Sequence, residues 1–132
     1  ENKLHFPEVL RQQVNRLISD PRSDDFVEGF VHQWLDMERL DLFQFDVKLY
    51  RDFDESTRAA CRREVYEFFA HLLRHSTHGH LGKLLKSDYV FVNGLLATYY
   101  GIDGVKAYSQ NSFFLDLFVL SLSFVIWLII YN

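Results

Sequence analysis

Apolar side chains recur at helical spacing along much of this sequence, and this period constrains its fold more than any other feature. In the clearest case they repeat at i, i+1, i+4, i+5, i+8 and i+9, which is typical of an amphipathic helix. This row comprises Phe26, Val27, Phe30, Val31, Trp34 and Leu35. An earlier helix is predicted over residues 7–18, with Pro7 in its first turn, where a missing N–H costs nothing. Its apolar face comprises Leu10, Val14, Leu17 and Ile18.

The longest helix is predicted from Asp54 to about His75, with one buried apolar stripe and one charged face. The stripe comprises Cys61, Val65, Phe68, Phe69, Leu72 and Leu73. The charged face comprises Arg58, Arg62, Arg63, Glu64, Glu67 and Arg74. Arg63 and Glu67 lie at i, i+4 and are expected to form an ion pair. Two shorter helices are predicted over residues 81–85 and 92–100, the second ending at Gly101.

Between residues 40 and 53 the helical period breaks, and apolar residues alternate with polar ones for a few positions. The alternating residues are Phe43, Phe45, Val47 and Leu49. Because no partner strand is evident nearby, we expect an extended aromatic segment that crosses the helices. Glycine (6) and proline (2) are scarce, which argues against a turn-rich all-β fold. The expected fold class is therefore all-α, a bundle-like domain of four or five helices followed by a C-terminal apolar helix from about Ser112.

Charge disappears towards the end of the chain. Of the 32 charged residues only Asp116 lies beyond Lys106, so we predict a boundary near residue 105. Residues 1–105 would form the helical domain and residues 106–132 an apolar tail. The stretch 113–131 approaches the roughly 20 apolar residues that a membrane span needs. Three interpretations of the tail stay open: a membrane anchor, a buried core helix, and a non-native extension from a truncated or frame-shifted reading frame.

Composition excludes several classes of protein. A net charge of −4 gives no nucleic-acid footprint, so we expect no nucleic-acid partner. The single cysteine, Cys61, excludes a disulfide within the chain and a CxxCH haem attachment, and it is expected to be a buried free thiol. The chain contains no P-loop, GxGxxG or GxSxG motif. We therefore expect no cofactor in this chain. Because residue 1 is Glu, we also expect a fragment or a processed product.

Several histidines near residue 75 are candidate metal ligands. His71 and His75 lie at i, i+4 and share a helix face, and His78 or His80 would supply a third ligand. The alternative is a solvated helix end, where a histidine suits the helix dipole. No HExxH pattern and no nearby cysteine support the metal interpretation.

Seven stretches between Lys3 and about Val105 resemble a known family in their order and spacing. They are PEVLRQQV from Pro7, SDPRSDDFVEGF from Ser19, QWL from Gln33, KLYRDFDE from Lys48, REVYEFF from Arg63, SDYVFVN from Ser87 and YYGI from Tyr99. Together they resemble the family called domain of unknown function 1592. That family occurs in large exported proteins of planctomycetes and related bacteria, often alongside a cytochrome-c-like domain.

The resemblance implies a helical domain whose biochemical activity is not established. It gives no catalytic residues to carry over. It also implies a further helical segment before residue 1, so the domain is expected to be incomplete at its N-terminus. Within the matched stretches we expect Trp34 to lie in the core, Asp88 to cap a helix and Asn93 to bond a turn.

These observations lead to one expected function and two alternatives. We expect a non-catalytic structural or interaction module of an exported multidomain protein, periplasmic or at the cell surface. Its expected partners are neighbouring domains of the same parent protein, and a haem domain would lie elsewhere in that protein. One alternative is a fragment of a redox or polymer-degrading enzyme whose site is completed by missing domains or by a metal at His71 and His75. The other is a small membrane-anchored helical protein that uses residues 113–131.

Overall fold

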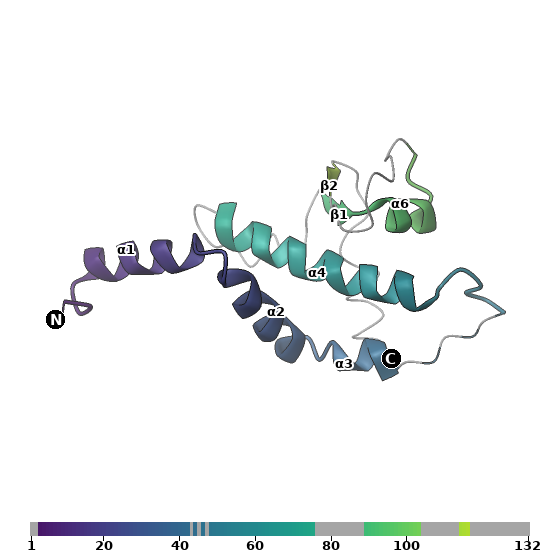
Figure 1. Ribbon diagram of the computed structural model, residues 1–132, viewed down its shortest axis with the longest axis horizontal. Helices are drawn as coiled ribbons and strands as arrows, with labels where there is room; N and C mark the ends of the chain where they lie inside the picture. Colours follow the sequence, from purple (N-terminus) through teal and green to yellow (C-terminus); the bar gives the residue numbers. More distant parts are fainter. Residues whose placement is uncertain are drawn as a thin grey trace.

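One long helix, α4, is the axis of the fold in the computed structural model of this chain (Figure 1). The structure describes residues 3–42, 44, 46, 48–75, 89–103 and 114–116. Its elements are α1 (Pro7–Ile18), α2 (Ser23–Trp34), α3 (Glu38–Leu42), α4 (Glu55–His75), β1 (Val90–Val92), α6 (Gly94–Tyr100) and β2 (Phe114–Asp116). The described residues are mostly helical, which confirms the all-α class.

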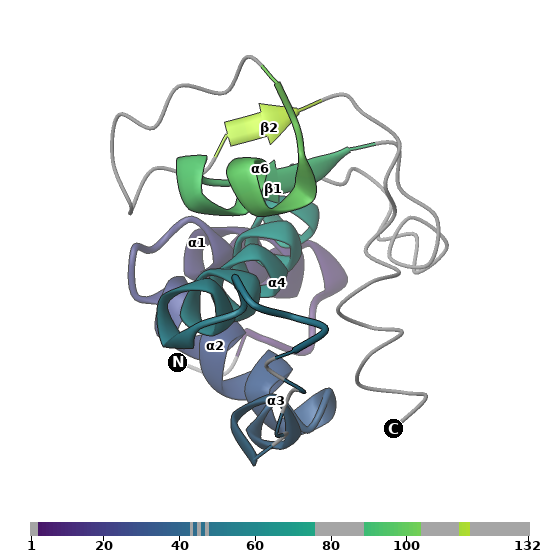
Figure 2. The ribbon, with the colours of Figure 1, turned by 90° about the vertical axis from the view of Figure 1, so that its right-hand side faces the viewer.

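Helix α4 is covered from two sides. Viewed nearly along its axis, α2 and α3 lie on one side and β1 and α6 on the other (Figure 2). The covering elements bury a large apolar core, with a smaller cluster of Phe68 and Phe91 beside it. Its fully buried members include Val31, Met37, Val65, Val92 and Leu96. We call α4 and the elements packed on it the body of the molecule.

Local sequence signals explain where the body's helices begin and end. The Asp54 carboxylate accepts a hydrogen bond from the Thr57 backbone N–H at 2.8 Å, which satisfies a free donor at the start of α4. Asn93 does the same for α6, accepting from the Leu96 N–H at 2.8 Å. Gly101 ends α6 with φ +69°, a left-handed conformation that favours glycine. The predicted end of this helix at Gly101 is therefore confirmed.

The prediction of helix from residue 92 needs a correction, since residues 90–92 form strand β1. This strand pairs antiparallel with β2, and Phe91 lies opposite Leu115. The C-terminal apolar helix expected from about Ser112 is not supported, because its described part, residues 114–116, is a strand. Strands β1 and β2 lie on either side of the domain boundary predicted near residue 105, and that boundary stays a prediction. The rest of the tail lies outside the described residues.

Two further expectations concern the membrane and the aromatic segment. Among the described residues, none of the helices is both long and apolar enough to cross a membrane. The segment expected to be extended over 40–53 begins instead as helix α3, which ends at Leu42. Phe43, Phe45 and Val47 lie outside the described residues, as does the helix predicted over 81–85. Phe53, at the other end of the segment, packs against the core as expected.

Candidate interaction surface

Helix α1 is amphipathic, yet none of its residues is buried. It spans Pro7–Ile18 as predicted, and Figure 1 shows it extending away from the body. The apolar face predicted from the spacing is open to solvent, with Leu17 55% exposed and Leu10 49% exposed. In a soluble helix such a face normally packs against another element. The covering element for α1 is not found among the described residues.

Helix α2 has an apolar stripe that is wider than its contact with α4. One edge of the stripe, Val27 and Val31, is buried against the core. The other edge is exposed by 49% to 62% and comprises Phe26, Phe30 and Trp34. The expectation that Trp34 lies in the core is therefore wrong, because this side chain is 49% exposed.

Polar contacts between α2 and α4 fix the rotation of α2 and so explain which edge is covered. An Arg74 amino group lies 2.6 Å from the Asp24 carboxylate and donates to the Ser23 hydroxyl at 2.8 Å. Farther along, Arg63 of α4 pairs with Glu28 of α2. These partners lie on the side of α2 that faces α4. The aromatic edge is consequently turned away from α4.

The three exposed rings form an ordered row along α2. Phe26 and Phe30 stack with their centroids 5.9 Å apart, and Phe30 and Trp34 stack at 5.7 Å. Trp34 also meets Phe69 of α4 edge to face at 5.6 Å. Because Phe69 packs against the core, the row is attached to the body at one end. Rings held in this way are rigid anchors of the kind found at binding hot spots.

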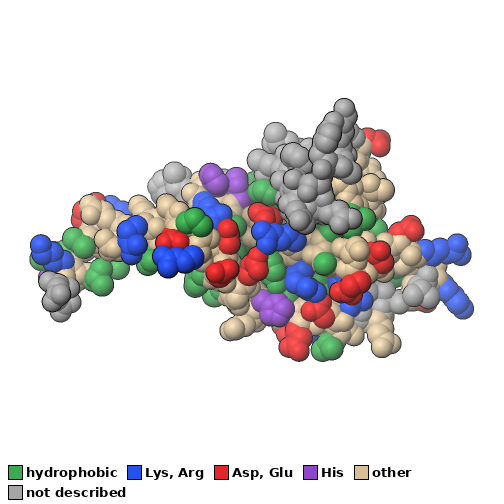
Figure 3. All heavy atoms as spheres, in the orientation of Figure 1, with side chains coloured by type: hydrophobic (Ala, Val, Ile, Leu, Met, Phe, Trp, Pro, Cys, Tyr) green, Lys and Arg blue, Asp and Glu red, His purple; other side chains and the backbone are tan. Residues whose placement is uncertain are grey.

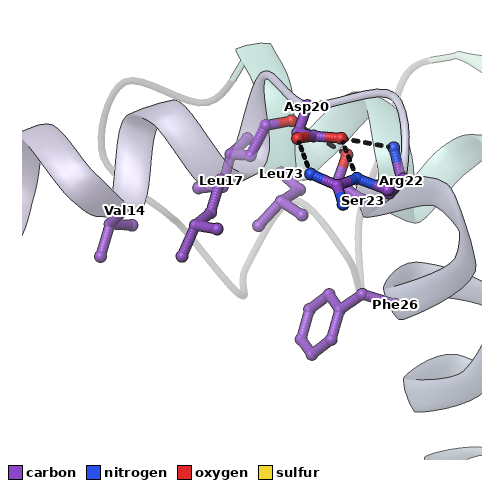
Figure 4. A pocket seen from close by; sticks show the side chains of 8 residues that line it. Val14, Leu17, Asp20, Arg22, Ser23, Phe26 and Leu73 are labelled. Carbon is purple, nitrogen blue, oxygen red and sulfur yellow. Dashed lines mark hydrogen bonds and ion pairs between the residues drawn. The ribbon is translucent and has the colours of Figure 1, made fainter.

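A hollow lies where α1 ends and α2 begins (Figure 4). It has a volume of about 630 Å³, and its apolar wall comes from α1, α2 and the end of α4. The wall comprises Val14, Leu17, Ile18, Phe26 and Leu73. The hollow therefore joins the face of α1 to the aromatic row of α2.

We name this continuous exposed region the apolar surface, and it is defined by Leu10, Val14, Leu17, Phe26, Phe30, Trp34 and Leu73. Their exposed fractions run from 37% to 62%. With about 200 Å² for a large side chain, they expose on the order of 700 Å². The largest apolar patch of a typical monomer is about 300–600 Å². In Figure 3, apolar side chains show along the lower side of the α1 arm, whereas acidic and basic side chains are interleaved over the body.

An ion pair stands at the edge of the hollow. The Asp20 carboxylate accepts from Arg22 Nε at 2.9 Å, from an Arg22 amino group at 2.7 Å and from the Arg22 backbone N–H at 3.0 Å. The hydrogen bonds from Arg22 lower the pKa of Asp20 to about 2. The sequence gives no signal that this pair lies beside an apolar hollow.

The candidate metal ligands His71 and His75 do lie together at the end of α4. Their rings stack with centroids 4.4 Å apart, and His75 Nδ1 lies 3.2 Å from the His71 carbonyl oxygen. His78 and His80 lie outside the described residues. In the part of the chain that the structure describes, no group of three metal-ligating side chains is found. The geometry thus supplies two ligands on one helix face.

A second polar cluster lies inside the body, and it corrects one expectation. Glu64 is predicted on the charged face of α4 but is only 4% exposed, and it accepts a hydrogen bond from the Tyr100 hydroxyl at 2.8 Å. Burial raises the pKa of Glu64 to about 7. The sequence does contain a sign of this burial. Glu64 lies three residues after Cys61 and four before Phe68, so it shares a helix face with these two apolar residues.

Cys61 is a buried free thiol, as predicted. Its sulfur lies 3.7 Å from the Tyr100 hydroxyl, and burial raises the pKa of the thiol to about 12. A thiol that stays protonated at neutral pH is a poor nucleophile. Asn93 bonds its turn as expected, since it caps α6, while Asp88 lies outside the described residues.

Comparisons with known proteins place the chain in a family but give no activity. Neither the curated proteins nor the solved structures contain a match to it. The family model described as "Protein of unknown function (DUF1592)" matches residues 1–102. This match covers most of the 132 residues and agrees with the stretches that carry the resemblance. The chain therefore belongs to the DUF1592 family.

Proposed function

We propose that this chain is a non-catalytic structural or interaction module that docks on a neighbouring domain of its parent protein through the apolar surface. The observation that carries the proposal is helix α1, which is amphipathic but has no buried residue. A helix of this length gains most of its stability in proteins from packing of its apolar face. A docked partner would supply that packing.

The size and composition of the apolar surface support a protein partner. Its area, on the order of 700 Å², approaches the roughly 800 Å² that each partner buries in a standard interface. The rings of Phe26, Phe30 and Trp34 form its centre, and aromatic side chains are enriched at interfaces. The ion pair of Asp20 with Arg22 at its edge is engaged within the chain, which suits binding better than proton transfer.

The wider context of the proposal rests on the family resemblance. The parent protein would be exported and multidomain, with a haem domain elsewhere in it and a role in redox or surface-polymer chemistry. In that setting this chain would hold neighbouring domains together.

Site-specific photo-cross-linking in the parent protein tests the docking. A photoreactive phenylalanine analogue placed at Phe30 should form adducts with a segment of the parent protein outside residues 1–132. The same analogue at Gln44, an exposed position after the end of α3, serves as the control and should give few adducts. Adducts that form equally at both positions, or only with lipid, would contradict the proposal.

A further inference from the structure

The hollow beside Arg22 has the features of a pocket for one large apolar side chain with a carboxylate next to it. Its wall is apolar, and Figure 4 shows Val14, Leu17 and Leu73 on one side and Phe26 on the other. The volume of about 630 Å³ is large enough for a leucine or phenylalanine side chain. The Asp20–Arg22 pair stands at the upper edge of this space in the same view.

The ion pair with Asp20 positions Arg22 but leaves some of its N–H donors available. The two bonds from its side chain to Asp20, at 2.9 and 2.7 Å, hold the guanidinium plane in place. A guanidinium carries five N–H donors, so others remain for a second acceptor. The Arg22 side chain is 83% exposed, whereas that of Asp20 is 23% exposed. A partner would therefore meet the arginine and not the aspartate.

The charge of this part of the chain favours an acidic partner. Residues 3–22 contain four basic side chains against two acidic ones, and of the acidic residues that follow in α2, Asp24 pairs with Arg74 and Glu28 with Arg63. The basic residues are Lys3, Arg11, Arg16 and Arg22, and the acidic ones are Glu8 and Asp20. Opposite charge across an interface speeds association and selects the partner.

The aromatic row of α2 indicates the shape of the partner. Phe26, Phe30 and Trp34 follow one another at i, i+4 and i+8 and so form a ridge of the kind that packs into the groove of another helix. A flat lipid surface fits less well, because the apolar surface is hollowed between α1 and α2.

We propose that the occupant of the apolar surface is an acidic amphipathic helix of the partner. One large apolar side chain of that helix fills the hollow, and a carboxylate one helical turn away binds Arg22. Residues three or four apart on a helix have Cβ atoms about 5–6 Å apart, which brings both groups to the same end of the surface. This inference rests on the proposed function and names the chemistry of the docked partner.

Two synthetic peptides test the proposal against the full chain. Each is an amphipathic 18-residue helix with leucines at i, i+3, i+4 and i+7, and its flanks carry glutamate in one peptide and lysine in the other. Fluorescence anisotropy should show that the acidic peptide binds at least about 10-fold more tightly, since one charge-assisted hydrogen bond is worth roughly that factor. Equal binding of the two peptides, or no binding of either up to about 1 mM, would overturn the proposal.

Substitutions in the chain separate the contribution of Arg22 from that of the apolar hollow. Arg22→Gln should weaken the acidic peptide about 10-fold and leave the basic one unchanged. Arg39→Gln, which removes the same charge from α3, is the matched control and should change neither. Phe26→Ser should weaken both peptides. If Arg22→Gln loses helicity by circular dichroism, Arg22→Lys keeps the charge without the fork-shaped donor set and should still weaken the acidic peptide.

Vesicles containing phosphatidylserine form the third arm. If the chain binds these vesicles and the acidic peptide does not bind, the occupant is a lipid surface and the proposed helix is wrong. In another outcome, Phe26→Ser abolishes cross-linking from Phe30 in the parent protein while the two peptides bind alike. That result would support docking on a protein and would contradict only the acidic character of the docked helix.

Discussion

The buried core of the body and the apolar surface are built from the same kind of helix face, but the first is covered and the second is exposed. Helix α4 buries Ala60, Cys61, Val65 and Phe68 along one face. Helix α1 has an equally regular apolar face and buries none of it. The difference lies in what covers each face, because α4 has elements on two sides and α1 has none among the described residues. An amphipathic period therefore shows that a face requires cover without showing which element provides it.

In helix α2, a single apolar stripe contains both buried and exposed side chains. Val31 is fully buried, whereas its neighbour in the sequence Phe30 is 50% exposed. Adjacent residues on a helix point in directions about 100° apart, so a small rotation of α2 decides which of them is covered. The contacts of Asp24 and Glu28 with α4 set that rotation.

The largest expected effect comes from truncating one phenylalanine in each region. Phe68 is 0% exposed and Phe26 is 62% exposed. Phe68→Ala should lower the free energy of unfolding by about 3–5 kcal/mol, because it removes a buried ring and leaves a cavity. Phe26→Ala should lower it by less than about 0.5 kcal/mol. Urea denaturation followed by circular dichroism measures both, and similar losses would show that the exposed row belongs to the core.

The pH dependence of stability tests the buried carboxyl of the body. The unfolded chain releases the Glu64 proton near pH 4.5, whereas the folded chain holds it to about pH 7. The folded state thus binds more protons between these values, so the free energy of unfolding should fall as the pH rises through this window. The contribution of Glu64 to this fall is about 3 kcal/mol.

Glu64→Gln should remove that contribution, since the amide keeps an acceptor for Tyr100 and cannot ionise. Glu67→Gln, at a half-buried position of α4 that pairs with Arg63, is the matched control and should leave the pH profile of the wild-type protein. A profile for Glu64→Gln that falls as steeply as that of the wild type would place Glu64 in water and not in the core.

The cap of α6 gives a smaller effect within the body. Asn93→Ala should lower the free energy of unfolding by about 1 kcal/mol, because the Leu96 N–H loses its acceptor. Asn93→Ser keeps a side-chain oxygen and should retain most of the stability. Thermal unfolding measures both variants, and equal losses for serine and alanine would mean that volume and not the cap is responsible.

The ion pairs that connect α2 to α4 should contribute still less. Arg74→Gln should lower the free energy of unfolding by about 0.5–1 kcal/mol, since Arg74 binds both Asp24 and Ser23. Arg11→Gln removes a pair with Glu8 that lies wholly within α1 and should have no measurable effect. A loss for Arg11→Gln as large as that for Arg74→Gln would show that α1 is coupled to folding of the body.

The smallest effect is expected at the histidine pair. Two imidazoles on one helix face are fewer ligands than structural and catalytic zinc sites use. Metal analysis of the purified protein should therefore find no stoichiometric zinc or iron, before or after His71→Ala with His75→Ala. Stoichiometric metal that is lost in the double variant would favour the enzyme alternative and would place a third ligand outside the described residues.

The sequence determined the features that depend on neighbours along the chain. It gave the limits of α1, the long helix ending at His75, the cap at Gly101 and the Arg63–Glu67 pair, now seen at 2.7 Å. Each of these depends on side chains within about one helical turn, and such interactions are the same in any fold. The side chains of the apolar surface were also recognised as apolar helix faces.

Only the tertiary structure decided which of those faces are covered. It turned the edge of Trp34 outwards, placed Glu64 under Tyr100 and paired residues 90–92 with residues 114–116. It also brought Arg22 and Leu73 to one hollow, although they are 51 residues apart in the sequence. These outcomes depend on contacts between distant segments, which compete for the same apolar faces. A local period cannot rank such competitors, because it fixes the direction of each side chain relative to its own helix and not relative to the next one.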